Sequence, residues 1–134
     1  MKLRTSSLKI GRVIHNELKD IIRTFPIIAD KNATYPFGIY KRLSLTSDNT
    51  KDIFNYEEEA NVEIIIATTT YDESVELAQA IKIRMESTKG SFETPKEEAI
   101  YIDNIELTNA SEDWQNDAYI QRLSFNITML KECC

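Results

Sequence analysis

Apolar residues at helical spacing open the chain and predict a first helix. They recur every three or four residues on one stripe, with charged residues between them: Ile10, Val13, Ile14, Leu18, Ile21, Ile22 and Phe25. Ser6 or Ser7 can cap the start of this helix with a side-chain oxygen. Pro26 ends it, because the residue before a proline avoids the helical region. We therefore expect about 18 helical residues before Pro26.

Alternating apolar and polar residues then predict a strand that starts after Pro36 and runs to Leu45. The polar stretch that follows, residues 46–59, contains a turn signal at residues 47–50. Three apolar residues interrupt this stretch: Ile53, Phe54 and Tyr56. We interpret it as a long, partly paired hairpin arm, because three such residues are out of place in a loop in solvent. They either pack on a neighbour or fold back on their own sheet, and the sequence favours neither.

A strand and a second helix come next. Residues 62–68 alternate around three consecutive isoleucines, which is typical of a strand that is covered on both faces. Residues 70–73 form a capping box, and apolar positions from Val75 to Met85 predict a helix behind it. Gly90 is a suitable stop for this helix. We expect residues 91–98 to be a polar connection.

Two further strands complete the pattern. In the first of them, the alternation of apolar and polar residues shifts by one position at residues 103–104, which predicts a β-bulge. Residues 109–117 are expected to form an acidic loop that carries Trp114, and residues 119–129 alternate throughout, as in a strand. The elements predict the order α-β-β-α-β-β. This is an α+β fold, with an antiparallel or mixed sheet and two helices packed on one face.

Length and charge narrow the class of protein. A chain of 134 residues fits a single domain over residues 1–134, with a short flexible C-terminal end. Its 16 basic and 22 acidic residues give a net charge of −6, which argues against tight binding to duplex DNA. Much of the acid falls in two predicted loop regions, residues 48–59 and 112–117. We find no signal peptide and no apolar run that could span a bilayer, so we expect no membrane partner.

Residues that carry chemistry are few. Cys133 and Cys134 are adjacent, which strains a bridge between them, and we expect a reduced, frayed tail. His15 falls within the predicted first helix, where a packed or solvated position is the ordinary role. Three glycines cannot build a phosphate loop. We therefore expect no enzyme activity, no catalytic residues, no cofactor and no metal site.

From Phe25 onward the chain resembles the tail terminator, or tail completion, family of tailed bacteriophages. The resemblance lies in an aromatic–proline pair before a strand, a tyrosine with acids before a Leu-Ala helix, and a closing aromatic–acid loop and strand. The segments that carry it are residues 26–29, 33–40, 62–67, 70–78, 114–117 and 119–125. Each motif alone is common, whereas the ordered set is more specific.

The resemblance implies a structural protein of the virion tail or neck, assembled in the bacterial host cytoplasm. Family members form a homo-oligomeric ring, commonly a hexamer, which ends the tail tube, joins it to the head and lets DNA pass. Their partners are the tail tube and head-completion or connector proteins, and they have no catalytic residues to carry over. A ring contact needs two different surfaces on one subunit. The candidate interface residues here are Ile53, Phe54, Tyr56 and Trp114.

Three alternatives remain open. The nearest is a head–tail connector or neck ring of a short-tailed phage, for which a dodecamer is an alternative stoichiometry. A small α+β enzyme would use carboxylates and His15 and would need a deep pocket. A regulatory or nucleic-acid-binding module would bind DNA with strong salt dependence. Its residues would be Lys2, Arg4, Lys9, Arg12, Lys41 and Arg42.

Overall fold

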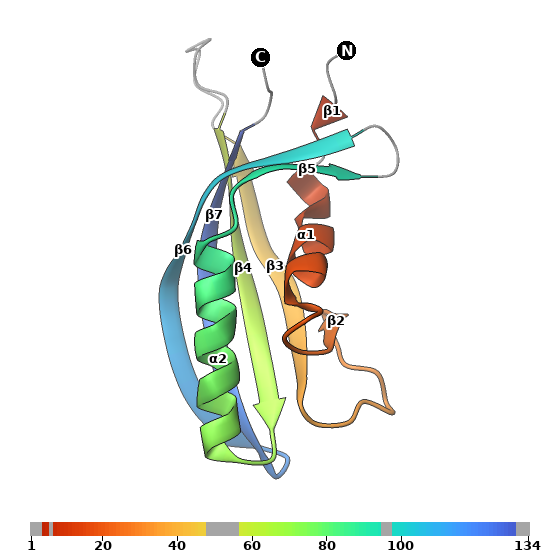
Figure 1. The fold of residues 1–134 in the computed structure, drawn as a ribbon, viewed down its shortest axis with the longest axis vertical. Helices are drawn as coiled ribbons and strands as arrows, with labels where there is room; N and C mark the ends of the chain where they lie inside the picture. The colour runs from red at the N-terminus through yellow and green to blue at the C-terminus, as the bar shows by residue number, and fades with distance from the viewer. Residues whose placement is uncertain (1–3, 6, 48–56, 95–97, 131–134) are drawn as a thin grey trace.

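The described residues form a two-layer α+β domain. The computed structural model describes residues 4–5, 7–47, 57–94 and 98–130. The helices are α1 (Ile10–Leu18), preceded by a 3-10 turn η1 (Ser7–Lys9), and α2 (Tyr71–Glu86). The strands are β1 (Arg4–Thr5), β2 (Thr24–Pro26), β3 (Phe37–Ser47), β4 (Glu57–Thr68), β5 (Gly90–Thr94), β6 (Glu98–Gln115) and β7 (Ala118–Leu130). Both helices lie on one face of the sheet (Figure 1).

The sheet is mixed and seven-stranded over these residues. Its order is β1-β6-β7-β4-β3-β2, and β5 pairs with β6. The short pairs β1–β6 and β2–β3 are parallel, and all other pairs are antiparallel. The predicted α+β class with a mixed sheet and two helices is therefore confirmed.

The predicted element order α-β-β-α-β-β is wrong, because the chain also contains three short strands. The strands β1 and β2 have two and three residues, too few to show an alternation. The third, β5, lies where a polar connection was expected. It pairs along its whole length with the start of β6, and Phe92 packs against the main core.

The first helix is shorter than the stripe predicted. α1 has nine residues and no side-chain cap, because its N-cap residue is Lys9 and not a serine. The hydroxyl of Ser7 donates to Glu58 Oε1 at 2.9 Å. After Leu18 the chain turns. The Leu18 carbonyl accepts hydrogen bonds from the N–H groups of both Ile21 and Ile22, each at 2.9 Å. This turn keeps both isoleucines against the core. The apolar stripe therefore continues beyond the end of the helix, into β2.

The second helix confirms the capping prediction. Thr70 is the N-cap residue, and its hydroxyl accepts the Glu73 N–H at 3.3 Å. The helix ends at Glu86, before the expected stop at Gly90. Gly90 instead begins β5 with a φ of 106°, which a residue without Cβ adopts at little cost.

The acidic loop predicted at residues 109–117 is wrong, because most of it continues β6. Pairing with β7 extends to Gln115 and Ala118, and only Asn116 and Asp117 form the turn. Their φ values of 52° and 61° suit a two-residue hairpin turn of type I′. The bulge predicted at residues 103–104 is confirmed by a register shift between Ile102 and Asn104.

The hairpin arm predicted at residues 46–59 is paired at its base. Thr46 lies opposite Glu59, and Ser47 lies opposite Glu58. Residues 48–56, which include the rest of the arm, lie outside the described residues.

The main core lies between the helices and the sheet. Along β7, buried residues from Leu123 to Met129 alternate with partly exposed polar ones, so a single face of this strand enters the core. Among the described residues, every buried side-chain nitrogen and oxygen has a hydrogen-bond partner. We call the opposite face, against which no described helix lies, the uncovered face (Figure 1).

Candidate subunit interface

The structure places one of the four sequence-predicted interface residues. Ile53, Phe54 and Tyr56 lie outside the described residues. Trp114 lies near the end of β6, beside the β6–β7 turn, and its side chain is 53% exposed. This exposed indole is the starting point for the site.

Trp114 belongs to a cluster of three aromatic residues from three elements. Its ring centroid lies 4.8 Å from that of Tyr119 on β7, with an angle of 67° between the rings. Tyr119 lies 6.0 Å from Tyr71 at the start of α2, again edge to face. Each such pair contributes about 0.5–1.5 kcal/mol beyond area burial. Tyr71 is 47% exposed, so the cluster is a surface rather than a part of the core.

A hydrogen-bond network holds this aromatic cluster in place. The carboxylate of Glu112 accepts hydrogen bonds from the Tyr71 hydroxyl and, at 2.8 Å, from Gln121 Nε2. Gln121 Nε2 also donates to the buried Ser74 Oγ at 3.2 Å, and that hydroxyl donates to the Tyr71 carbonyl at 2.7 Å. These contacts link the start of α2 to both strands of the hairpin. The exposed rings are therefore already ordered, which lowers the entropic cost of binding a partner.

The pKa values of two groups reflect the same network. Hydrogen bonds from Tyr71 and Gln121 lower the pKa of Glu112 below its usual range. The hydrogen bond to Glu112, together with the charge of that carboxylate, raises the pKa of Tyr71. The hydrogen bond thus joins a charged Glu112 to a protonated Tyr71 at neutral pH.

The uncovered face of the sheet is a second surface of distinct chemistry. Its central residues are polar, and Asn61 Nδ2 donates across the β3–β4 pair to Ser44 Oγ at 3.1 Å. The strand registers place five acidic residues on it: Glu57, Glu59, Glu63, Glu106 and Asp113. They place two basic residues there, Lys41 and Arg122, and Lys41 Nζ lies 3.7 Å from Glu63 Oε1. Near the β6–β7 turn the face becomes apolar, around Ala67 and Ile120.

Sequence reasoning missed four residues that the structure makes prominent. Tyr71 was interpreted only as part of a capping box, and Tyr119 only as the start of a strand. A two-residue turn after Gln115 would have placed Tyr119 opposite Trp114, so this signal was available. Ile27 and Ile28 follow β2 and are 74% and 76% exposed, and no pattern in the sequence distinguishes them from core isoleucines.

The other candidate residues lie apart from this cluster. His15 Nδ1 lies 2.8 Å from the hydroxyl of Thr24, and the imidazole is tilted against the ring of Tyr40. Within the described ranges, no group of three or more His, Cys, Asp and Glu residues is placed to hold a metal ion. Neither α1 nor α2 is long and apolar enough to cross a bilayer. Cys133 and Cys134 lie outside the described residues.

Comparison with protein families and with curated proteins identifies no relative of this chain. No family model matches the chain, and no curated protein matches it. The candidate interface is therefore argued from the exposed aromatic cluster, the network beneath it and the charge of the surrounding surfaces.

Proposed function

We propose that this chain is the subunit of a homo-oligomeric ring that ends the tail tube of a bacteriophage and joins it to the head. DNA passes through the ring, and the tail tube and head-completion or connector proteins bind its two ends. The protein acts by shape and contact, without catalysis, and is part of the virion. The ordered sequence segments that resemble the tail terminator family support this proposal.

The observation that carries the proposal is the difference between the two faces of the sheet. The helices bury one face, whereas the uncovered face is polar except near the β6–β7 turn and carries five acidic residues against two basic ones. A wall around passing DNA needs a surface that does not bind phosphate. A net negative face meets that need because like charges repel at short range. We assign the uncovered face to the channel of the ring.

The direct test of the ring is electron microscopy of the purified chain at increasing concentration, together with its native mass. Closed particles with a central channel are the expected result. Six copies in a particle support a tail terminator, whereas twelve support the alternative of a neck or connector ring. Monomers at every concentration, or open filaments, would contradict the proposal.

The channel assignment has its own test, in which three acids of the uncovered face are neutralised. The triple variant Glu59→Gln, Glu63→Gln and Glu106→Gln should bind duplex DNA more tightly than the wild type, because it removes phosphate repulsion. Fluorescence anisotropy of a labelled duplex at low and moderate salt measures this change.

A matched control removes the same charge from positions outside the strands of the uncovered face. The variant Asp72→Asn, Glu76→Gln and Asp117→Asn changes α2 and the β6–β7 turn instead. It should raise DNA affinity less than the variant of the uncovered face does. Equal affinities for the two triple variants would remove the reason to place the uncovered face toward DNA.

A further inference from the structure

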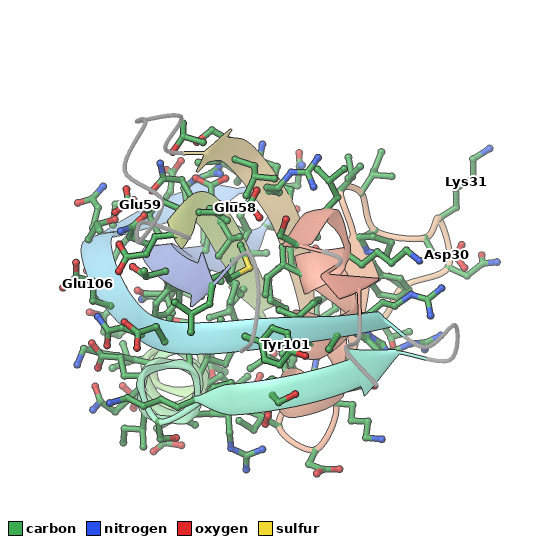
Figure 2. All side chains as sticks on the ribbon, turned by 90° about the horizontal axis from the view of Figure 1, so that it is seen from above. Asp30, Lys31, Glu58, Glu59, Tyr101 and Glu106 are labelled. Atoms are coloured by element: carbon green, nitrogen blue, oxygen red, sulfur yellow. The ribbon has the colours of Figure 1, made fainter. Side chains whose placement is uncertain are left out.

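The two lateral edges of the sheet carry opposite charge. Residues 7–47 build α1, β2 and β3 at one edge and contain seven Lys and Arg but three Asp and Glu. Residues 71–86 and 103–117, which are α2 and most of β6, lie toward the other edge and contain nine Asp and Glu but two Lys and Arg. We call these the basic edge and the acidic edge. In Figure 2, Lys31 projects on one side of the molecule and Glu106 on the opposite side.

The acidic edge has an apolar surface and, in the described part of the chain, a stretch of β6 that pairs on one side only. Trp114, Tyr71 and Val75 are exposed there, by 53%, 47% and 40%. In the described part of the chain, β5 pairs with β6 only as far as Ile102. From residue 103 to Gln115 the outer side of β6 has no strand partner among the described residues, which is a common docking feature of sheet edges.

The basic edge has an apolar surface of its own, built on a strained turn. Ile27 has a φ of 65°, and the Ile28 N–H donates to the Pro26 carbonyl at 2.6 Å, which closes a γ-turn. A β-branched residue with positive φ is a marked outlier. The Ile27 N–H is fixed by the Tyr40 carbonyl at 2.9 Å, so the turn is held while it presents two isoleucines to solvent. Strain that displays apolar side chains is typical of a functional surface.

The two apolar surfaces lie toward the same end of the sheet. Tyr40 pairs with Ile64, Ile64 with Leu123, and Leu123 with Ala110 on β6. The Ile27 turn adjoins one end of this row, and Trp114 lies four residues beyond Ala110 at the other. In Figure 1 the chain after β2 and the β6–β7 turn both lie at the lower end of the molecule. The two surfaces are offset along the strand direction by about four residues, roughly 13 Å, so a second copy that is tilted to match this offset brings one surface against the other.

We infer that the subunit contact of the ring joins the Ile27–Ile28 turn of one copy to the Trp114, Tyr71 and Val75 surface of the next. This inference rests on the proposed ring and specifies its contact. Arg23 and Lys31 lie near the isoleucine turn in the sequence, with Asp30 between the turn and Lys31, while Asp113 and Asp117 lie near the indole, with Arg122 within 3.5 Å of Gln115. The excess charge is therefore basic beside the turn and acidic beside the indole, and apolar groups meet with opposite net charges around them. The contact is heterologous, and a heterologous contact forms a ring when the rotation between neighbouring copies closes.

Charge also selects this contact over a two-fold dimer. Two acidic edges brought together would set like charges against each other, and two basic edges would do the same. Such juxtaposition is costly, whereas the head-to-tail arrangement pairs opposite signs. Each edge of one copy therefore binds the oppositely charged edge of a second copy.

Disulfide cross-linking tests the contact directly. In a background with Cys133→Ser and Cys134→Ser, the variants Ile28→Cys and Trp114→Cys are made on separate chains. Mixed and oxidised with diamide, they should form a covalent dimer that neither variant forms alone at the same concentration. A single chain with both substitutions should give a ladder of covalent oligomers that ends at the ring.

A matched control uses another exposed isoleucine. Ile83 on α2 is 59% exposed and lies outside the proposed contact. A mixture of Ile28→Cys and Ile83→Cys chains should therefore give no covalent dimer above the level of either chain alone. Equal yields for the 28–83 and 28–114 mixtures would overturn the inference.

Cross-linking and the ring assay together distinguish a failure of the proposed contact from a failure of the proposed ring. Rings seen without the 28–114 cross-link would overturn the contact and leave the proposed function standing. A 28–114 dimer in a chain that never closes a ring would support the contact and contradict the proposed function. Absence of both would overturn both.

A charge swap gives a second, non-covalent test. Arg23→Glu with Lys31→Glu should weaken association about three- to tenfold, as should Asp113→Lys with Asp117→Lys. Mixing the two charge-reversed chains should restore association between unlike copies. Failure of the mixture to associate more strongly than either variant alone would overturn the pairing of these edges.

Discussion

Replacement of Ile27 by glycine should cost the protein much less stability than the same replacement at Ile28. Ile27 has a φ of 65°, whereas Ile28 is outside the left-handed region. The left-handed conformation costs an L residue about 1–2 kcal/mol, because Cβ approaches the following carbonyl oxygen. Glycine has no Cβ and removes this cost at position 27 only.

The other contributions to the change in stability are nearly the same for the two variants. The side chains are 74% and 76% exposed, so each variant loses the burial of about a quarter of an isoleucine. That loss is roughly 0.4–0.8 kcal/mol, a quarter of the full value for the side chain. Glycine adds about 0.5–1 kcal/mol of backbone entropy at either position. We therefore expect Ile28→Gly to destabilise the fold by about 1–2 kcal/mol and Ile27→Gly to leave it nearly unchanged.

Urea unfolding followed by circular dichroism measures this difference, at a concentration where the chain is monomeric. Equal slopes against urea for both variants are required, so that the midpoints report stability alone. The expected difference in free energy of unfolding between the two variants is about 1–2 kcal/mol. An Ile27→Gly variant as unstable as Ile28→Gly would refute the claim that this turn stores strain.

Three further predictions concern the fold that positions the interface. Thr70→Ala removes the N-cap acceptor of α2 and should lower the urea midpoint by the equivalent of about 1 kcal/mol, whereas Thr70→Ser should not. Phe125→Ala empties a fully buried position and should cost about 3–5 kcal/mol in thermal or urea unfolding, and a loss below about 1 kcal/mol would contradict the described core. The lowered pKa of Glu112 means that its carboxylate stabilises the fold above the ordinary glutamate pKa, and that this stabilisation is lost as the pH falls through the lowered value. Glu112→Gln should therefore flatten the fall in stability below about pH 4.3, and an unchanged acid slope would count against the network.

Whether an element could be predicted from the sequence depended on which of its residues are buried. In α2, and in β7 from Leu123 to Met129, one face is buried throughout, so the period of the apolar residues reveals the structure. The end of α1 was not predictable, because the turn after Leu18 keeps Ile21 and Ile22 in the core and extends the stripe. The second half of β6 was not predictable for the opposite reason. Its residues from 108 to Gln115 are exposed on both faces, so no alternation marks them as a strand.

The candidate site was predictable only in part. Trp114 stands out in the sequence as an aromatic residue among acids, and the structure exposes it. Its contact with Tyr71 depends on where α2 begins relative to the β6–β7 turn, which is a property of the folded chain. The Ile27 turn depends on a backbone angle that the side-chain pattern does not encode. The opposite charge of the two edges emerges only when the sheet order separates β2 and β3 from the second half of β6.

The central claim is that this chain closes into a ring, and its native mass tests that claim most directly. Mass spectrometry of the wild-type protein under native conditions, over a series of concentrations, should give one dominant closed species. For a hexamer of the 15.5 kDa chain this is roughly 93 kDa. A monomer at every concentration, or an unbounded series of oligomers, would contradict the account.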